Sequence, residues 1–233
     1  ASHALGSVQN GVKVGVKADI SIFSFHPVKP ITTLEGGALA TNDDELARLA
    51  RLYRSHGITK TKLWDSDMSL LGYNYRITDV ACALGLSQLK RLDDFIAKRN
   101  EIAKFYDDKF SGCEYFKTIK IPANTTSSRH LYPVLLDEKF WDKKEQIFEA
   151  LLQKGVGVQI FAALHKRGIG VQVHYKPTYK FSFYKALLGE ISLQNAEKFY
   201  SAELSLPCHH GMSVDDAKFV ASTLFDVLKS FSE

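Results

Sequence analysis

The segment between residues 23 and 38 constrains this chain most, because it places a single lysine between two prolines directly after an apolar strand. Its sequence reads FSFHPVKPITTLEGGA. The β-forming residues at its start favour a strand, and Pro27 and Pro30 then interrupt regular structure on both sides of Lys29. Each proline fixes its own φ and biases the preceding residue away from helix. We therefore predict a stiff, non-helical turn that presents one lysine.

The local sequence leaves two interpretations of Lys29 open. A surface lysine in a proline-rich turn accounts for the pattern without any function. Alternatively, the lysine holds its amine against one carbon of a cofactor, because such a group gains from pre-organisation whereas a solvated lysine does not. The Gly36-Gly37 pair that follows Glu35 allows a close backbone approach before the next apolar run.

The composition is that of an ordinary globular chain. Of the 233 residues, 45% are apolar and 24% are charged, and the net charge of +4 arises from lysines and arginines interspersed with acids. This pattern indicates solvated faces, so we expect no nucleic-acid partner. No segment has the roughly 18 apolar residues of a membrane span and none resembles a signal peptide, so we expect no membrane partner. Three widely spaced cysteines, an odd number, favour reduced thiols and a cytoplasmic location.

Local patterns predict an α/β chain. We expect a hairpin over residues 9–17, strands over 18–25 and 37–41, and a helix from a cap at Asn42 or Asp43 to about residue 55. The segment 58–76 is expected to be a long loop, and loops of this length inside a domain tend to be functional. A helix capped by Thr78 should follow over 79–92, with a small-residue apolar face for close packing, and then a second helix over 94–110.

The remainder of the chain has the pattern of a small α/β domain. We expect a strand over 129–136, helices over 143–153, 195–204 and 214–231, and an aromatic group at 181–184 that packs rather than covers a ligand. Residues 147–159 and 160–172 form a tandem repeat of 13 residues with eight identities. Two copies are too few for a solenoid, and the Gly-x-Gly pairs lack the third glycine of a dinucleotide site. His209-His210 lacks the spacing of a zinc site, so we expect no metal.

Three motifs together resemble the DegT/DnrJ/EryC1 family of sugar-nucleotide aminotransferases, which have the aspartate aminotransferase type I fold. They are Ser-Phe-His-Pro-x-Lys followed by Glu-Gly-Gly-Ala, Gly-Tyr-Asn-Tyr-Arg before Thr78-Asp79, and His-Tyr-x-Pro at 174–177. The resemblance implies an α/β fold in two parts. Residues 1–93 would be the C-terminal part of the large domain that binds pyridoxal 5'-phosphate, and residues 94–233 a small C-terminal domain.

The resemblance also implies roles for individual residues. In the family, the lysine of the first motif forms the Schiff base with pyridoxal 5'-phosphate, which assigns catalysis to Lys29 and a phosphate contact to Ser24. His3 matches the position beside the ring hydroxyl of the cofactor. Asn74 matches an asparagine that reaches the cofactor phosphate of the neighbouring subunit. Contacts to the substrate would come from His26, Arg76, His174 and Tyr175.

The particular residues found in and near these motifs resemble one branch of the family. The segments LWDSDM at 63–68 and HYKPTY at 174–179 are similar to the branch that aminates C4 of a UDP-4-keto-6-deoxy-N-acetylhexosamine on the route to pseudaminic acid, which decorates bacterial surface glycans and flagellin. The resemblance implies transamination with glutamate as the amino donor, in a homodimer with shared active sites. Because a free lysine has a pKa of about 10.4, such a site must lower the pKa of Lys29.

The resemblance covers about the last three fifths of a family member. In the family, an aspartate for the pyridine nitrogen, a helix N-terminus for the phosphate and an aromatic stacked on the ring precede the segment that begins at Ala1. We therefore expect this chain alone to bind pyridoxal 5'-phosphate weakly or not at all. Two other interpretations stay open: a truncated and duplicated remnant or binding module without catalysis, and a small-molecule sensor on the same fold.

Overall fold

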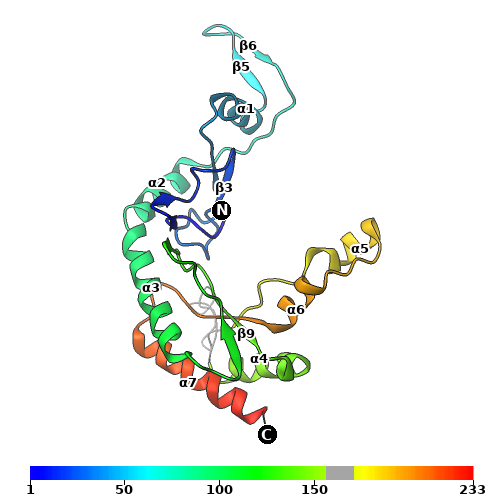
Figure 1. Ribbon diagram of the computed structural model, residues 1–233. Coiled ribbons are helices and arrows are strands. Elements are labelled where there is room, and N and C mark those ends of the chain that lie inside the picture. The colour runs from blue at the N-terminus through cyan, green and yellow to red at the C-terminus, as the bar shows by residue number, and fades with distance from the viewer. Residues whose placement is uncertain (156–170, 233) are drawn as a thin grey trace. The chain divides into compact units, whose positions relative to one another are not determined.

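The structure, a computed structural model, describes residues 1–155 and 171–232 (Figure 1). By their internal contacts, these residues form two units, which are described separately below. Unit 1 contains Ala1–Ile96 and Ile121–His130, and unit 2 contains Ala97–Lys120 and Leu131–Glu233. Each unit combines helices with strands, in agreement with the predicted α/β class, and the strand pairs described here are antiparallel. The predicted domain boundary between residues 93 and 94 stays a prediction.

Unit 1 opens with the predicted hairpin, formed by β1 (Val8–Gln9) and β2 (Val12–Lys13). Asn10 and Gly11 join the two strands with φ angles of 50° and 76°, the left-handed conformation that a two-residue hairpin turn needs. The strand β8 (Thr125–Thr126) pairs with the other edge of β1, so a segment from much later in the chain completes this small sheet.

The second sheet of unit 1 holds the segment with the proline-bracketed lysine. Here β3 (Ser21–Ser24) pairs antiparallel with β4 (Gly37–Ala40), and Ser24 lies opposite Gly37. A Cβ atom at Gly37 would lie 2.7 Å from the carbonyl oxygen of Phe23, so this close pairing requires glycine. Residues 25–36 therefore form a loop whose two ends are joined by the sheet.

The predicted caps begin the first two helices where the sequence indicated. Helix α1 (Asp44–Arg54) starts after Asp43, whose carboxylate accepts a hydrogen bond from the backbone N–H of Leu46 at 2.9 Å. Helix α2 (Asp79–Leu89) starts after Thr78, whose hydroxyl accepts from the backbone N–H of Ala81 at 3.3 Å. No residue of α2 is fully buried within the described chain, although Gly85 lies close to Thr33, so the expected close packing of its small-residue face stays a prediction.

The long loop predicted over 58–76 is partly wrong. It contains a short antiparallel hairpin of β5 (Ile58–Lys60) and β6 (Ser66–Met68), with Leu63 and Trp64 at its exposed tip. All six strand residues are exposed, so the strands are specified by mutual pairing rather than by an alternating buried face. Sequence periodicity therefore carried no signal for this element.

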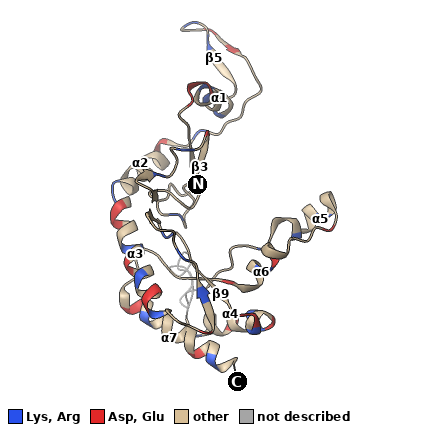
Figure 2. Ribbon diagram, viewed as in Figure 1, with Lys and Arg blue, Asp and Glu red and all other residues tan. Residues whose placement is uncertain are grey.

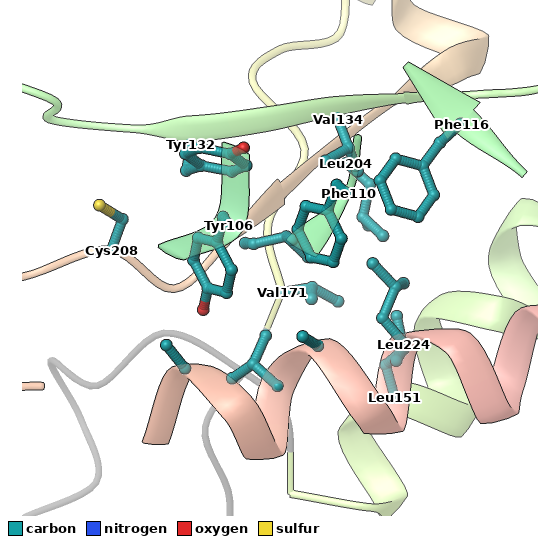
Figure 3. Close-up of a cluster of buried hydrophobic side chains, with 14 of the residues drawn as sticks. Tyr106, Phe110, Phe116, Tyr132, Val134, Leu151, Val171, Leu204, Cys208 and Leu224 are labelled. Carbon is teal, nitrogen blue, oxygen red and sulfur yellow. The ribbon is translucent and has the colours of Figure 1, made fainter. Parts of the chain in front are cut away.

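Unit 2 is built on an antiparallel sheet of order β10-β9-β7. The centre is β9, and its residues alternate between buried and half-buried, as expected for a strand with one face on a core. Its aromatic core includes Tyr106, Phe110 and Tyr132, which stack or tilt against one another (Figure 3). The strands are β7 (Phe116–Thr118), β9 (Tyr132–Leu136) and β10 (Glu203–Leu206).

Helices cover the core of unit 2. Helix α3 (Leu92–Lys109) starts in unit 1 and supplies Tyr106 from its second half, and Phe110 directly follows its end. Helix α7 contributes seven buried side chains. Only the helical part of the tandem repeat is described, because residues 156–170 lie outside the described residues. The remaining elements are η1 (Glu138–Lys143), α4 (Lys144–Gln153), η2 (Thr178–Lys180), α5 (Ser182–Leu188), α6 (Gln194–Ala202) and α7 (Val214–Ser230).

Two expectations for unit 2 are corrected. The predicted helix over 195–204 ends at Ala202, and the chain then forms β10, whose four residues are all buried. The aromatic group at 181–184 was expected to pack, but Phe181, Phe183 and Tyr184 are 43%, 69% and 40% exposed. They lie at the start of the short helix α5, which buries no residue within the described chain.

Charges of both signs are spread along the helices. Basic and acidic residues both occur along the length of α3 (Figure 2). Two of its ion pairs, Lys98 with Glu101 and Lys104 with Asp108, have distances of 2.7 Å. This agrees with the solvated faces inferred from the sequence. Among the described residues, no helix has the length and apolar character that a transbilayer segment requires.

Candidate functional site

The loop between β3 and β4 is closed by its own backbone, and this fixes the place of Lys29. The N–H of Phe25 donates to the carbonyl of Gly36 at 2.9 Å, and the N–H of Thr33 donates to the carbonyl of Phe25 at 3.0 Å. Within the loop, the N–H of Lys29 donates to the carbonyl of His26 at 3.0 Å, which closes the turn between the prolines. The predicted non-helical turn around Lys29 is confirmed.

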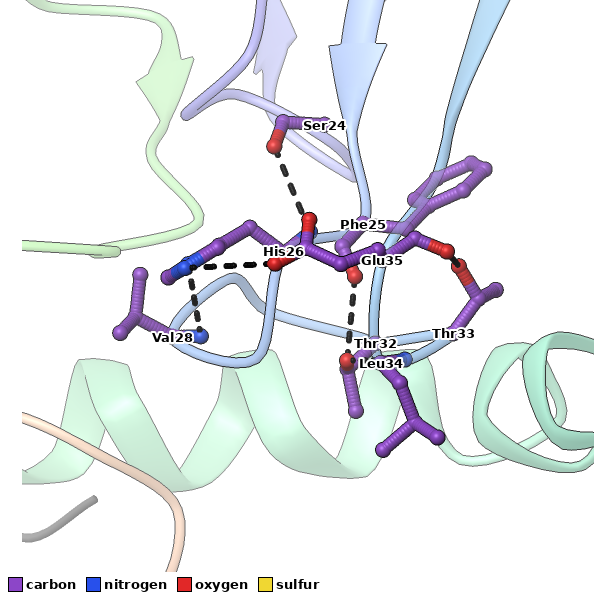
Figure 4. A network of polar contacts seen from close by, with 8 residues as sticks. All are labelled: Ser24, Phe25, His26, Val28, Thr32, Thr33, Leu34 and Glu35. Carbon is purple, nitrogen blue, oxygen red and sulfur yellow. Dashed lines mark hydrogen bonds and ion pairs between the residues drawn. The ribbon is translucent and has the colours of Figure 1, made fainter. Parts of the chain in front are cut away.

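Side chains of the loop add a second set of contacts (Figure 4). The hydroxyl of Thr32 donates to the carbonyl of Phe25 at 3.0 Å, and that of Thr33 donates to the carbonyl of Glu35 at 2.8 Å. His26 Nε2 lies 3.9 Å from a carboxylate oxygen of Glu35, with both side chains largely in solvent. The threonines therefore hold the loop rigid, whereas the exposed ion pair contributes little to stability.

Burial changes the chemistry of Lys29. The side chain is half-buried, between the exposed Pro27 and the buried Pro30, and this burial lowers the pKa of the Lys29 amine below its ordinary value. A lower pKa increases the fraction of uncharged amine at neutral pH, and the uncharged amine is the form that attacks a carbonyl carbon. The site thus shifts Lys29 in the direction that imine formation requires.

His3 shares the electrostatic surroundings of Lys29. Burial lowers the pKa of His3, and the positive charge of Lys29 lowers it further. The imidazole packs edge-on against His130 with ring centroids 4.4 Å apart, and the His3 carbonyl accepts a hydrogen bond from the Ser128 hydroxyl at 2.9 Å. The segment 121–130 therefore anchors the N-terminal turn that carries His3, and the lowered pKa favours the neutral form of its ring.

Ser24 stands at the end of β3, five residues before Lys29. Its hydroxyl oxygen accepts a 3.4 Å hydrogen bond from the backbone N–H of His26 and is half-buried. Ser24, His26 and Lys29 thus lie within six residues, at the end of β3 and in the loop that follows it.

The second motif lies in the segment that leads to α2. Asn74 is exposed, and its backbone pairs as an isolated bridge with Ser55 at the end of α1. Arg76, also exposed, lines a pocket of about 710 Å³ within unit 1. The same pocket is lined by Arg51 and Arg54, two cationic side chains of α1 that the sequence analysis did not single out.

His174 and Tyr175 lie in unit 2, where a buried carboxylate organises them. The backbone N–H of His174 donates to Glu203 Oε2 at 2.7 Å, and His174 Nδ1 lies 2.8 Å from the hydroxyl oxygen of Ser205. Burial raises the pKa of the Tyr175 phenol, and the charge of Glu203 adds to this. Sequence reasoning missed Glu203 and Ser205; the acid in an otherwise apolar run, Glu-Leu-Ser-Leu, was the available signal.

The family follows from comparison with known proteins. A model of the DegT/DnrJ/EryC1/StrS aminotransferase family matches residues 1–225. This chain belongs to that family. The match confirms the resemblance inferred from the three motifs, and with it the type of fold.

Named members of the family show which proteins the chain is similar to. It is 60% identical over 229 residues to the UDP-4-amino-4,6-dideoxy-N-acetyl-beta-L-altrosamine transaminase of Campylobacter jejuni, and 42% identical over 230 residues to that of Helicobacter pylori. These alignments cover 98% and 99% of this chain but 57% and 58% of the relatives. The chain therefore spans a little more than half the length of the curated relatives it matches.

Solved structures agree. The Helicobacter pylori aminotransferase PseC, described as involved in the biosynthesis of pseudoaminic acid, superposes with a TM-score of 0.90 at 40% identity, over 99% of this chain and 58% of that one. A putative sugar aminotransferase of Streptococcus pneumoniae has been solved in two forms, and both are 29% identical to this chain. The form with pyridoxal phosphate superposes with a TM-score of 0.86 over 99% of this chain, and the form with pyridoxamine phosphate with a TM-score of 0.87 over 100%. In each case this chain covers 57% of the solved chain. Members of this DegT/DnrJ/EryC1/StrS family use pyridoxal 5'-phosphate as cofactor.

The residues of unit 1 fit this cofactor. An aldehyde requires an amine with a lowered pKa, which burial gives Lys29, and a phosphate requires a hydroxyl donor, which Ser24 offers at the end of the same strand. A neutral imidazole, as in His3, suits a ring hydroxyl. Among the described residues, no three His, Cys, Asp or Glu side chains gather as a metal ion requires.

Proposed function

We propose that this protein catalyses pyridoxal 5'-phosphate-dependent transamination of a UDP-4-keto-6-deoxy-N-acetylhexosamine, with glutamate as amino donor, on the route to pseudaminic acid. The observation that carries the proposal is the amine of Lys29, half-buried in a loop closed by its own hydrogen bonds and lowered in pKa by that burial. The 60% identity to a transaminase of the 4-amino sugar named above supports the choice of substrate class.

Each residue has a role that follows from its chemistry. Lys29 would hold the cofactor through its amine, and its Nζ would carry a proton to and from the α-carbon of the donor. Ser24 would donate to the cofactor phosphate, and the His3 ring would contact the ring hydroxyl. When bound, the cofactor supplies an electron sink for the carbon that loses its proton. Substrate contacts are assigned to His26, Arg76, His174 and Tyr175.

The proposal includes a homodimer with shared active sites in the cytoplasm. Asn74 is exposed, so its amide is available to reach the cofactor phosphate of a neighbouring subunit. All three cysteines are free thiols, as the reducing cytoplasm would maintain them. Neither a nucleic-acid nor a membrane partner is part of the proposal.

The test of the cofactor site is chemical trapping. The chain is incubated with increasing pyridoxal 5'-phosphate and reduced with borohydride, and the modified lysines are located by peptide mass spectrometry. Because this chain alone is expected to bind the cofactor weakly, the adduct should form only at high cofactor concentration, but it should be enriched at Lys29 and lost in Lys29→Ala. The exposed Lys17 serves as matched control, and Lys17→Ala should leave the Lys29 adduct unchanged. Modification spread evenly over exposed lysines would remove the assignment.

The test of the reaction uses glutamate and the 4-keto sugar nucleotide, with the aminated product identified by mass spectrometry. Product formation that disappears in Lys29→Ala supports the transaminase. A Lys29 adduct without any product would instead favour the binding-module alternative.

A further inference from the structure

The pocket of unit 1 has a cationic wall, of which only Arg76 has a proposed role. Its volume of about 710 Å³ is that of a small-molecule site, and every residue that lines it belongs to unit 1. Three of these residues, the pocket arginines, are Arg51, Arg54 and Arg76. Among the described residues of the lining, Glu35 is the single acid, so the formal charge of the lining is +2. This charge predicts an anionic ligand.

Backbone hydrogen bonds join the two segments that carry the pocket arginines. The N–H of Tyr75 donates to the carbonyl of Arg54 at 2.9 Å, and the N–H of Tyr73 donates to the carbonyl of Tyr53 at 2.7 Å. The segment that leads to Arg76 is therefore attached along the end of α1. Because the backbones of all three arginines are fixed before a ligand arrives, less ordering is needed when it binds.

The pocket arginines differ from their neighbour Arg48 in having no carboxylate partner. On the same helix, Arg48 donates from two nitrogens to the two carboxylate oxygens of Glu45, both at 2.7 Å. None of the pocket arginines forms an ion pair within the part of the chain that the structure describes. The dipole of α1 favours cations in its last turn, but Arg76 lies outside the helix and gains nothing from it.

A second wall of the pocket is aromatic and apolar. Tyr75 is 70% exposed and stacks on Tyr73, with ring centroids 4.8 Å apart and planes 5° from parallel. Leu34, Leu39 and Ile77 line the pocket together with Tyr75, and Figure 4 shows Leu34 in the loop that also carries Glu35. A tyrosine held by stacking offers a flat surface to a nucleotide base. The pocket thus combines a cationic wall with an apolar one.

The charge of the lining distinguishes two kinds of anion. A carboxylate carries about one negative charge and is satisfied by one bidentate arginine, which would leave the other guanidinium groups unpaired. A diphosphate diester carries about two negative charges, one on each phosphorus, and offers enough oxygens for several arginines. A diphosphate therefore matches both the charge and the number of donors.

We propose that this pocket binds the diphosphate group of a nucleotide, with Arg51, Arg54 and Arg76 around the phosphates and Tyr75 against the base. The diphosphate contact is argued from unit 1 alone. That the nucleotide is the sugar nucleotide of the reaction rests on the proposed function.

Isothermal titration calorimetry on the whole 233-residue chain, without cofactor or ketosugar, measures the affinities for inorganic pyrophosphate and for UDP. We expect one site per chain for each compound. Arg51→Gln, Arg54→Gln and Arg76→Gln should each weaken both affinities about fivefold, because each removes one charged donor at an exposed position. Arg48→Gln is the matched control and should leave both affinities unchanged, since Arg48 is already paired with Glu45.

Three results would overturn the proposal. The first is no binding of either compound to the folded parent chain at low ionic strength, where screening is weakest. The second is an equal loss of affinity in Arg48→Gln and in the variants of the pocket arginines, which would show an effect of net charge alone. The third is displacement of pyrophosphate by an equal concentration of glutamate, which would assign the pocket to a carboxylate.

A further variant separates a nucleotide from a free diphosphate. Tyr75→Ala should weaken the binding of UDP and leave that of pyrophosphate unchanged, because only UDP has a base to stack. An equal effect on both compounds would overturn the nucleotide and retain a site for inorganic diphosphate.

These measurements need no turnover, so they are independent of the proposed function. Binding of UDP that depends on the pocket arginines, in a chain that forms no transamination product, would refute the transaminase and retain this site. Product formation by a chain that binds neither compound would do the reverse.

Discussion

Lys29 and His3 are coupled side chains in the same part of unit 1, and burial is the main cause of the lowered pKa of each. The coupling is visible at His3, where the Lys29 charge adds to the effect of burial. Burial thus shifts both groups toward their uncharged forms, and at His3 the nearby charge of Lys29 adds a second, smaller shift in the same direction.

Removing the Lys29 charge should raise the pKa of His3. In Lys29→Ala we expect the pKa of His3 to move upward toward the ordinary value near 6.5, but to stop below it because burial stays. A proton NMR titration of the His3 ring measures this. Lys17→Ala, at an exposed lysine, is the control and should leave the titration in place. An unchanged His3 pKa in Lys29→Ala would mean that the two groups do not interact.

His209 should make the stability of unit 2 depend on pH. Burial, and then the charges of Arg99 and His210, lower the pKa of His209 from 6.5 to about 4. Between about pH 6.5 and 4, His209 is protonated in the unfolded state but not in the folded state. The free energy of unfolding therefore decreases as pH falls through this range. After allowance for the partial exposure of the ring, the loss is about 1 to 2 kcal/mol.

Urea unfolding of unit 2 tests this, followed by the fluorescence of Trp141 in a Trp64→Phe background. We expect His209→Gln to flatten the dependence on pH between about 4 and 6.5. The control is His56→Asn, at an exposed histidine with φ of 64°, where asparagine tolerates the left-handed backbone. An equal dependence of the free energy of unfolding on pH in the parent chain and in His209→Gln would contradict the role given to His209.

At the scale of the elements, α7 depends on its first turn. The Ser213 hydroxyl accepts from the N–H of Asp216 at 3.1 Å, and the Asp216 carboxylate accepts from the N–H of Ser213 at 2.7 Å. This reciprocal cap satisfies two N–H groups of a helix that contributes much of the unit 2 core.

Ser213→Ala should therefore destabilise unit 2 by about 1 kcal/mol, as typical loss of an N-cap does. Ser222→Ala, at an exposed position within the same helix, is the matched control and should change stability by a few tenths of a kcal/mol at most. The same urea unfolding measurement compares them. A Ser213→Ala variant as stable as Ser222→Ala would show that the cap contributes nothing.

The elements show why some of the fold was predictable from sequence and some was not. Helices α1 and α2 begin at Asp43 and Thr78 because a cap is a contact within three residues, which the sequence displays directly. The hairpin of β5 and β6 and the strand β10 are three or four residues long, and their existence depends on partners elsewhere in the chain. The helix α6 ends at Ala202 and β10 begins at the next residue, Glu203. Because no turn residue separates them, the sequence did not indicate where the helix ends.

The candidate site divides in the same way. Ser24, His26 and Lys29 lie within six residues, so their grouping was readable from the sequence. The contact between His174 and Ser205 joins residues 31 apart and depends on strand register, which no local pattern reports. For Asn74 and Arg76 the roles came from the family resemblance, and they stay proposals.

At the scale of the whole molecule, large apolar side chains of unit 1 face solvent. On α2, Val80 is 81% and Leu86 is 63% exposed, and at the hairpin tip Leu63 and Trp64 are 92% and 83% exposed. Soluble monomers rarely present this much apolar surface without a partner. We therefore expect the chain to self-associate, in keeping with the proposed homodimer.

Sedimentation velocity across a dilution series tests this expectation. Val80→Asp should shift the distribution toward the monomer, because a charge on an apolar contact surface must be desolvated when the surface is covered. Phe219→Asp, on α7 at a position 48% exposed, is the control and should leave the distribution unchanged. A monomer at all concentrations of the parent chain would contradict self-association through this surface.

Both faces of the strand β10 are buried, and this limits the alignments with β9 that are stable. Leu204 and Leu206 enter the apolar core, while Glu203 and Ser205 form hydrogen bonds with each other and with His174. A slip of one residue against β9 would drive a carboxylate into the aromatic interior and strand two leucines among polar partners, at a cost of several kcal/mol. The alternation of buried polar and buried apolar side chains along β10 therefore specifies its alignment with β9 against any shift by a single residue.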